Sequence, residues 1–245
     1  CMVTEGKAQL TQEYSIDGLP IRIPLIDIHT IGAGGGSVIW VDDGGMLRIG
    51  PQSSGADPGP ACYGRGGQLP TLTDAHLIRN TVRPEAFLGG RMEIFSDRSR
   101  AALQPVAERL GMSLEDAADS AIQLANANVV RAIQLISTER GFDPRDYVLV
   151  PFGGAGPLHA ASVASDLGVS QVVVPPSAGV ISAFGLIASD FTQFSSLTRR
   201  VMVDEQAPKL LRETYAAMQN EALAKFQILK LKGDPVFDFV ADMRF

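Results

Sequence analysis

Hydrophobic and polar positions follow a short-range pattern in the first quarter of the chain. Apolar and β-branched residues between Gln12 and Asp27 predict short strands. Two apolar runs, Val38 to Asp42 and Met46 to Ile49, flank an Asp-Gly-Gly turn and predict a β-hairpin. About half of the 25 glycines lie between Gly32 and Gly67, where each would cost a helix about 1 kcal/mol. Strands and loops are therefore expected here.

From Ser99 onward, apolar residues recur at the spacing of helices. One amphipathic helix is predicted up to Gly111. A longer helix begins at Ser113, a favourable N-cap with Asp116 three residues later, and ends at Gly141. Its apolar positions are mostly small, which predicts close packing against another element.

The last part of the chain alternates short apolar strands with helices. The predicted order is strand Tyr147 to Phe152, helix Leu158 to Leu167, strand Gln171 to Val174 and helix Val180 to Ser189. This alternation favours a sheet covered on both faces. An amphipathic helix between Leu211 and Leu229 and an edge strand over Val236 to Val240 follow. The predicted parts are a β-rich, Gly-rich region over 1–80, a helical segment over 81–145 and an α/β lobe over 146–245.

Composition places the chain among globular proteins, since 45% of its 245 residues are apolar and 20% are charged. Acidic residues outnumber basic ones by 27 to 21, and Lys and Arg form no patch, so nucleic acid is not an expected partner. Two cysteines are too few for a disulfide framework, and a cytoplasmic location is expected. Cys62, with no base nearby in sequence, is interpreted as a small buried residue.

The uncharged segment Leu167 to Ser189 is long enough to span a membrane, but prolines and glycines interrupt it. It is interpreted as buried α/β core, and no membrane association is expected. The start of the chain lacks the pattern of a signal peptide. Because it opens at Cys1 and stops just after a strand-like run, the chain is interpreted as a piece of a longer protein.

The first candidate site is the stretch DIHTIGAGGGS, from Asp27 to Ser37. Four glycines in five positions leave no Cβ atoms in the way, so that consecutive N–H groups can turn toward one anion. Asp27 and His29 stand two positions apart and would share a strand face, where they could bind a metal or orient a water. A sharp turn with a hydrogen-bonded Asp and His explains the same residues, and the pattern leaves both interpretations open.

A second candidate, VPFGGAGPLH, runs from Val150 to His159 at a junction of strand and helix. Such junctions present glycines and free helix N–H groups where α/β folds bind nucleotides and other anions. Gly154 and Gly156 lack the third glycine of a dinucleotide fingerprint, and no Walker-type lysine follows. His159 is interpreted as a packed or capping side chain in preference to a catalyst.

The third candidate is the long loop from Gly50 to Gly67, followed by TLTDA over Thr71 to Ala75. Ordered loops of this length are often functional. Arg65 could meet a phosphate or carboxylate, and Asp57 and Asp74 could hold a metal or polarise a water. A surface Arg and turn-forming Asp residues account for the same pattern.

Six stretches carry a resemblance to a known family. They are DIHTIGAGGGS (Asp27 to Ser37), GPQSSGADPGPACYGRGG (Gly50 to Gly67), TLTDA (Thr71 to Ala75), GFDPRD (Gly141 to Asp146), FGGAGPLHA (Phe152 to Ala160) and PPSAGVISAFGLIASD (Pro175 to Asp190). Together, and in this order, they resemble the hydantoinase A/5-oxoprolinase family. Several long motifs are far more specific than any one Gly-rich loop.

The resemblance implies an α/β fold: a ribonuclease-H-like lobe of the actin/sugar-kinase/Hsp70 superfamily, with a Gly-rich β and loop region and an inserted helical segment. It also implies an enzyme that uses ATP and a divalent cation, Mg or Mn. Such an enzyme would phosphorylate the carbonyl of a 5-oxoproline-type or hydantoin-type lactam, so that ring opening becomes favourable. Implied partners are the small cyclic amide and a hydantoinase B-type subunit or domain, and a homo-oligomer is an option.

By the same resemblance, nucleotide is expected at Gly153, Gly154, Ala155 and Gly156, and phosphate or substrate at Gly34, Gly35, Gly36 and Ser37. Asp27 and His29 are the expected catalytic residues, and no metal ligands are assigned. The family's phosphate motifs, resembling DxGGTFTD and DMGGTSTD, are absent from this chain. The chain is therefore expected to be inactive alone.

Two alternatives stay open at the level of sequence. One is a subunit of an ATP-dependent acetone or acetophenone carboxylase, which resembles the same family but joins a ketone to bicarbonate. The other is a scaffold portion of such a complex, in which these loops pack against a partner subunit.

Overall fold

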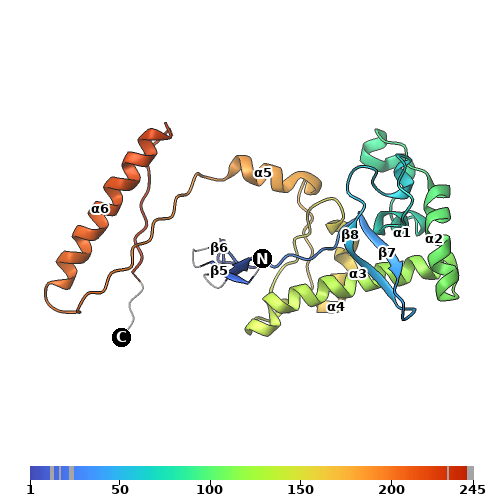
Figure 1. Ribbon diagram of the computed structural model, residues 1–245, viewed down its shortest axis with the longest axis horizontal. Helices are drawn as coiled ribbons and strands as arrows, with labels where there is room; N and C mark the ends of the chain where they lie inside the picture. The colour runs from blue at the N-terminus through green and yellow to red at the C-terminus, as the bar shows by residue number, and fades with distance from the viewer. Residues whose placement is uncertain (12–13, 17, 22–24, 231, 242–245) are drawn as a thin grey trace. The chain divides into compact units, whose positions relative to one another are not determined.

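The computed structural model describes residues 1–11, 14–16, 18–21, 25–230 and 232–241 (Figure 1). The chain forms two compact units, Cys1–Ala188 and Ser189–Phe245. Helices and strands are both present, as expected for an α/β protein. No helix among the described residues is long and apolar enough to cross a membrane.

The first unit opens with three small antiparallel strand pairs. The pairs are β1 (Val3–Thr4) with β2 (Lys7–Ala8), β3 (Leu10–Thr11) with β6 (Leu25–Ile26), and β4 (Tyr14–Ile16) with β5 (Leu19–Ile21). The strand-rich start is thus confirmed, while Gln12, Glu13, Asp17 and residues 22–24 of the predicted stretch lie outside the described residues.

The predicted hairpin is confirmed as β7 (Ser37–Val41) and β8 (Leu47–Ser53), paired antiparallel. Its turn is closed by Asp42, whose Oδ1 accepts hydrogen bonds from the N–H groups of Gly44 (3.0 Å) and Met46 (2.9 Å). Ile39 and Val41 are buried while Trp40 between them is exposed, as expected when one face of a hairpin packs on the core.

Three helices form the core with the hairpin: α1 (Leu72–Ile78), α2 (Ser96–Leu110) and α3 (Leu114–Ile136) (Figure 1). The helix predicted from Ser113 is confirmed as α3, where the Ser113 hydroxyl caps the helix by accepting from the Asp116 N–H at 3.1 Å. The buried positions of α3 are Ala117, Ala118, Ala121, Ala125 and Asn126. These small side chains confirm the predicted close packing.

Sequence reasoning missed α1, although a capping box marks its start. Thr71 Oγ1 accepts from the Asp74 N–H, and Asp74 Oδ2 accepts from the Thr71 N–H at 2.9 Å. A Thr followed three residues later by Asp is a recognisable start signal. Short 3₁₀ turns connect these helices and the next ones, at η1 (Ala61–Tyr63), η2 (Pro84–Gly90), η3 (Thr138–Arg140) and η4 (Pro144–Asp146).

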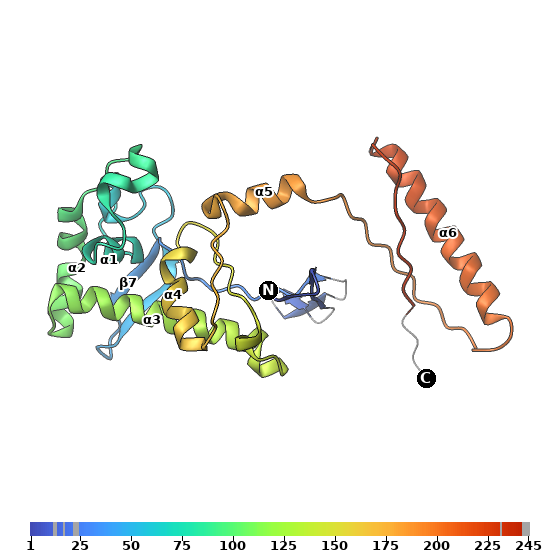
Figure 2. The same ribbon diagram turned by 180° about the vertical axis from the view of Figure 1, so that it is seen from behind.

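Helix α4 (Gly156–Leu167) packs beside α3 (Figure 2), close to its predicted bounds. The two predicted strands around it are reduced to one parallel bridge between Leu149 and Val172. A sheet covered on both faces is therefore not formed by these segments. With one bridge and no further strand of the described residues paired to them, Val150, Val173 and Val174 remain about half exposed.

The segment predicted as buried core ends in η5 (Ala178–Val180) and α5 (Ile181–Ala188). The helix is confirmed, but the predicted burial is wrong. Leu186 and Ile187 are 80% and 85% exposed, because no other described element covers this helix.

The second unit contains α6 (Ala207–Ile228), which confirms the last predicted helix. The predicted edge strand over Val236 to Val240 is wrong, since these residues adopt no regular structure. An edge strand needs a neighbouring strand to pair with, and the described part of this unit contains none. Instead, the ring of Phe239 contacts that of Tyr215, with centroids 4.9 Å apart.

Candidate functional site

Two of the Gly-rich motifs line one cavity in the first unit. The cavity has a volume of about 200 Å³ and is lined by Ala33 and Gly34 of the first motif and by Pro151 to Phe152 and Ala155 to Gly156 of the second. Leu72 and residues of α3 and α4 complete its walls. A Cβ added to Gly35 would lie 3.9 Å from that of Ala155. Loops more than 100 positions apart in sequence are thus in contact.

The first loop is held by hydrogen bonds from its own residues. The N–H of Gly34 donates to Ser37 Oγ at 2.9 Å, and Ser37 Oγ donates to the Gly32 carbonyl at 3.3 Å. The sharp turn considered from sequence is therefore present, and the Gly34 N–H is used for a hydrogen bond within this turn. Ser37 itself is buried.

The same loop is also packed against α1 and β8. The Gly35 carbonyl accepts from both the N–H and the hydroxyl of Thr73, each at 2.9 Å. A Cβ at Gly35 would approach Thr73 Oγ1 to 2.7 Å, and one at Gly36 would approach Ser53 Oγ to 2.9 Å. Because glycine has no Cβ, these two positions allow the side chains of Thr73 and Ser53 to lie close to the loop backbone.

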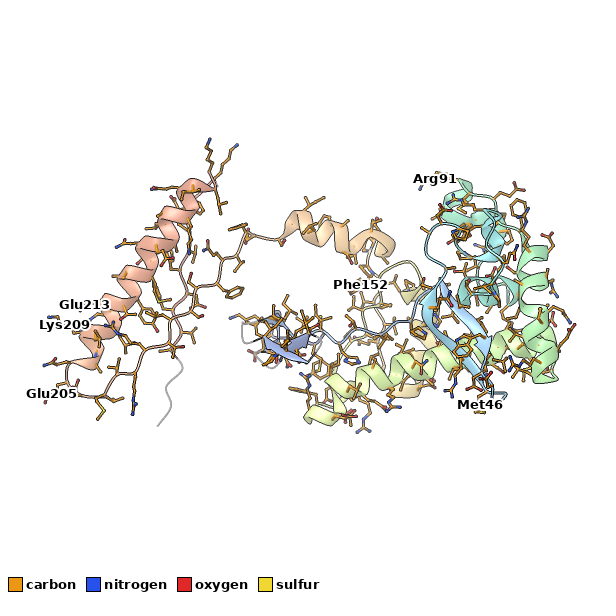
Figure 3. All side chains as sticks on the ribbon, in the orientation of Figure 1. Met46, Arg91, Phe152, Glu205, Lys209 and Glu213 are labelled. Carbon is orange, nitrogen blue, oxygen red and sulfur yellow. The ribbon has the colours of Figure 1, made fainter. Side chains whose placement is uncertain are left out.

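The second loop is open on the side away from the core. Gly153 has a φ of +84° and donates its N–H to the Ala178 carbonyl at 2.8 Å. A Cβ at Gly154 would meet nothing within 4 Å. Phe152, labelled in Figure 3, is half exposed. Helix α4 begins directly after the loop, and the positive end of its dipole favours negative charge. In this turn Pro157 has no N–H, and the Leu158 N–H donates to the Ala155 carbonyl at 3.0 Å. These features fit a ligand with phosphates and a ring.

Asp27 and His29 do not share a strand face, because β6 ends at Ile26. The Asp27 carboxylate forms an ion pair with the Arg140 guanidinium, and its N–H donates to the Gln9 carbonyl at 2.8 Å. The side chain of His29 is exposed. Sequence reasoning missed Arg140, which directly precedes the GFDPRD motif.

A divalent cation is not held by the described part of the chain. It contains no group of three His, Cys, Asp or Glu side chains that could bind a metal. The Asp27 carboxylate is already paired with Arg140. These residues do not fit a cation site.

Asp74, considered as a metal ligand, is instead a fully buried hydrogen-bond acceptor. Its oxygens accept from the N–H groups of Ala61 (3.2 Å), Cys62 (2.8 Å) and Thr71 (2.9 Å), and from the hydroxyls of Thr71 (2.8 Å) and Ser99 (2.7 Å). It therefore ties the end of the long loop to α1 and α2.

The other residues of the third candidate do not gather around Asp74. Asp57 is exposed, and the exposed Arg65 guanidinium lies 6.0 Å from the Tyr63 ring centroid. Cys62 is buried as predicted, and burial raises the pKa of its thiol. It is therefore a poor nucleophile.

Two buried histidines lie side by side, a contact that the sequence did not predict. His76 on α1 and His159 on α4 bring their Nε2 atoms to 3.4 Å, and His159 lines the cavity. Burial lowers the pKa of His76 to about 4, helped by the neighbouring His159, and burial also lowers the pKa of His159. His159 is packed, as its position in the first turn suggested, while no sequence signal connected it with His76.

Comparison with known proteins gives a family match. The family model described as hydantoinase/oxoprolinase matches residues 1–194. The chain is 38% identical over 215 residues to caprolactamase subunit alpha from Pseudomonas jessenii, covering 87% of this chain and 31% of that subunit. It is 36% identical to a 5-oxoprolinase from Dictyostelium discoideum, covering 91% of this chain and 18% of that protein.

Solved structures show the same relationship. The ATP-dependent caprolactamase from Pseudomonas jessenii matches with a TM-score of 0.70 and 36% identity, over 89% of this chain and 32% of that one. A nucleotide-free acetone carboxylase, studied for ATP-dependent acetone carboxylation, matches with a TM-score of 0.71 and 32% identity, over 77% of this chain and 27% of that one. The chain thus spans less than a third of the length of these relatives.

Proposed function

The chain belongs to the hydantoinase/oxoprolinase family, and we propose that it is the nucleotide-binding part of an ATP-dependent hydrolase of cyclic amides. The observation that carries the proposal is the cavity lined by both Gly34 and Gly156, between two loops singled out from sequence for phosphate and nucleotide contact. Its lactam-hydrolysing relatives, caprolactamase and 5-oxoprolinase, support this reaction class.

In this proposal ATP supplies a phosphoryl group that turns the amide oxygen into a leaving group. The N–H groups of Gly154, in the open loop, and Gly156, at the start of α4, receive phosphate oxygens. Asp27 and His29 contact the substrate, and Arg140 holds Asp27 in place. The same proposal includes an actin-like fold for the nucleotide-binding lobe.

The complete enzyme, in this proposal, is cytoplasmic and works with a second, hydantoinase B-type subunit. The name of the caprolactamase subunit alpha, which implies further subunits, supports a partner. Other segments of the complete enzyme then supply the acidic phosphate motifs and the cation. Together with the loops of this chain, they form the full site.

A ketone carboxylase is the second candidate, supported by the similarity to acetone carboxylase, with a TM-score of 0.71. The two reactions differ in their co-substrate. In the complete subunit with its partner, phosphate release that requires a lactam supports the hydrolase. Release that requires both a ketone and bicarbonate supports the carboxylase, and release unaffected by Asp27→Asn or His29→Gln supports the scaffold role for these residues.

Nucleotide binding by this chain is tested with Gly154→Val. The chain is titrated with Mg-ADP, with calorimetric heat and the fluorescence of Trp40 as readouts. A Cβ at position 154 would meet no atom within 4 Å, and Gly154 has no positive φ, so Gly154→Val should fold normally yet block the loop and lower affinity for Mg-ADP at least about tenfold. Gly185→Val, equally open, is the matched control. Equal affinity of wild type and Gly154→Val for Mg-ADP would show that this loop does not bind the nucleotide.

A further inference from the structure

Two arginines of the long loop and of η2 meet around one methionine in the first unit. Arg65 Nη2 lies 3.9 Å from Met92 Sδ, and the Arg65 guanidinium lies 6.0 Å from the Tyr63 ring centroid. Arg91, labelled in Figure 3, directly precedes Met92 and donates from Nε to the Leu88 carbonyl at 3.0 Å. Both arginines are exposed.

Arg98, also exposed, joins them from the first turn of α2. Its guanidinium carbon lies 4.9 Å from the centroid of the Phe95 ring. A Cβ added to Gly64 would lie 2.8 Å from that ring and 3.3 Å from Arg98 Nη1. The Arg98 guanidinium is therefore close to the residue that directly precedes Arg65. We call Arg65, Arg91 and Arg98, together with Tyr63 and Leu88, the arginine surface.

The positive charge of the arginine surface is not neutralised by the described part of the chain. Elsewhere in the first unit, ion pairs with carboxylates are formed by Arg48, Arg79, Arg100, Arg140 and Arg145. Among the described residues, no carboxylate forms an ion pair with Arg65, Arg91 or Arg98. Each guanidinium has five N–H donors in a planar fork that matches a carboxylate. Most of these donors remain available for an anionic partner.

The backbone beside Arg91 is strained. Leu88 has a φ of +49° and a ψ of +36°, in the left-handed region that favours glycine. Gly89 and Gly90 follow with φ of +68° and +76°. The Leu88 side chain is 59% exposed, so it adds little to the core in return for this strain. Strained positions of this kind often lie where proteins bind other molecules.

Resting on the proposed function, which includes a partner subunit, we propose that the arginine surface binds a short acidic segment of that subunit. Carboxylates of the segment pair with Arg65 and Arg98 in two parallel hydrogen bonds each, and an apolar side chain of the segment packs against Leu88. Arg and Tyr are enriched among the residues that contribute most to protein interfaces. The names of two relatives, caprolactamase subunit alpha and acetone carboxylase beta subunit, support the existence of a partner.

A short protein segment fits this surface better than nucleic acid or a run of phosphates does. The chain has a net charge of −6, so the rest of the molecule repels a long polyanion. Glu85, Glu93 and Asp97 are exposed and lie close in sequence to the arginines, where they repel closely spaced negative charges. A few carboxylates on either side of an apolar side chain meet the arginines with less repulsion.

A fluorescent peptide of sequence EDELEDE, titrated with the chain and followed by anisotropy, tests the proposal. We expect saturable binding that weakens as the ionic strength rises, and no binding of the peptide KKKLKKK. Arg65→Gln and Arg98→Gln should each lower the affinity for EDELEDE at least about fivefold. Arg131→Gln removes the same charge from an exposed position of α3 and should change it less than about twofold.

Three results of this titration overturn the proposal. They are the absence of EDELEDE binding, an equal effect of Arg65→Gln and Arg131→Gln, and displacement of the peptide by an equal concentration of inorganic phosphate. The last result would show that the surface takes a single phosphate and not a protein segment.

Leu88→Gly separates binding from folding. Glycine adopts a positive φ without strain, so urea denaturation should show a stability at least equal to that of wild type. The variant should bind EDELEDE at least about threefold more weakly. It should not respond when the peptide's Leu is replaced by Gly, because that contact is already lost. Wild-type affinity for EDELEDE in Leu88→Gly contradicts the contact given to Leu88.

The same surface is tested in the complete subunit with its partner by sedimentation velocity. The charge reversals Arg65→Glu and Arg98→Glu should weaken assembly at least about tenfold and leave the affinity for Mg-ADP unchanged. Full assembly of both variants overturns the proposal. The peptide titration needs no nucleotide. Peptide binding without Mg-ADP binding therefore contradicts the proposed function alone, and Mg-ADP binding without peptide binding contradicts the arginine surface alone.

Discussion

At the scale of single residues, buried polar side chains in the first unit act as hubs between segments. Asp74 accepts five hydrogen bonds from four residues and is fully buried. A carboxylate has about four lone-pair positions, so its capacity is fully used. The sequence singled out Asp74 for chemistry, but its partners point to a structural role.

Replacing Asp74 should therefore destabilise the fold strongly. Asp74→Ala leaves several buried donors without partners, at a cost of about 1–3 kcal/mol each before relaxation. We expect a loss of at least about 3 kcal/mol in the free energy of unfolding, measured by urea denaturation. Asp57→Ala, at an exposed position, should change stability by less than about 0.5 kcal/mol. A stable Asp74→Ala variant would contradict the hub role.

At the scale of elements, the small side chains of α3 decide how near its neighbours can lie. Ala117, Ala118 and Ala121 have no exposed surface and pack in the core with α1 and α2. The Ala-rich periodicity predicted this helix well, because periodicity and the Ser113 cap are local signals. The predicted strands over 147–152, 171–174 and 236–240 are not formed. Strand formation depends on neighbouring strands, which periodicity does not describe.

Enlarging one of these alanines should separate the helices. Ala121→Leu inserts three carbon atoms into a filled core, and we expect a loss of about 1–3 kcal/mol in unfolding free energy. Ala101→Leu, on the exposed face of α2, should leave stability within about 0.5 kcal/mol of wild type. Urea denaturation of both variants measures the difference. Equal stabilities would show that α3 has room for larger residues.

At the scale of the whole molecule, the chain divides after Ala188. Between α5 and α6, residues Ser189 to Gln206 have no regular structure and are exposed. Exposed irregular segments are preferred sites of proteolysis. Limited chymotrypsin digestion should therefore cut first after Phe191, Phe194 or Leu197, as read by mass spectrometry. First cuts within α3 would contradict this division.

The sequence by itself determined the hairpin, five of the helices and the family, because caps, turns and long motifs act through neighbouring residues. The missed α1 also had a local signal, the capping box at Thr71 and Asp74. Only the tertiary structure decided that Gly34 and Gly156 line one cavity, that Asp27 pairs with Arg140, and that His76 meets His159. These contacts join residues 83 or more positions apart. Such pairs meet through the packing of whole elements, which local pattern does not encode.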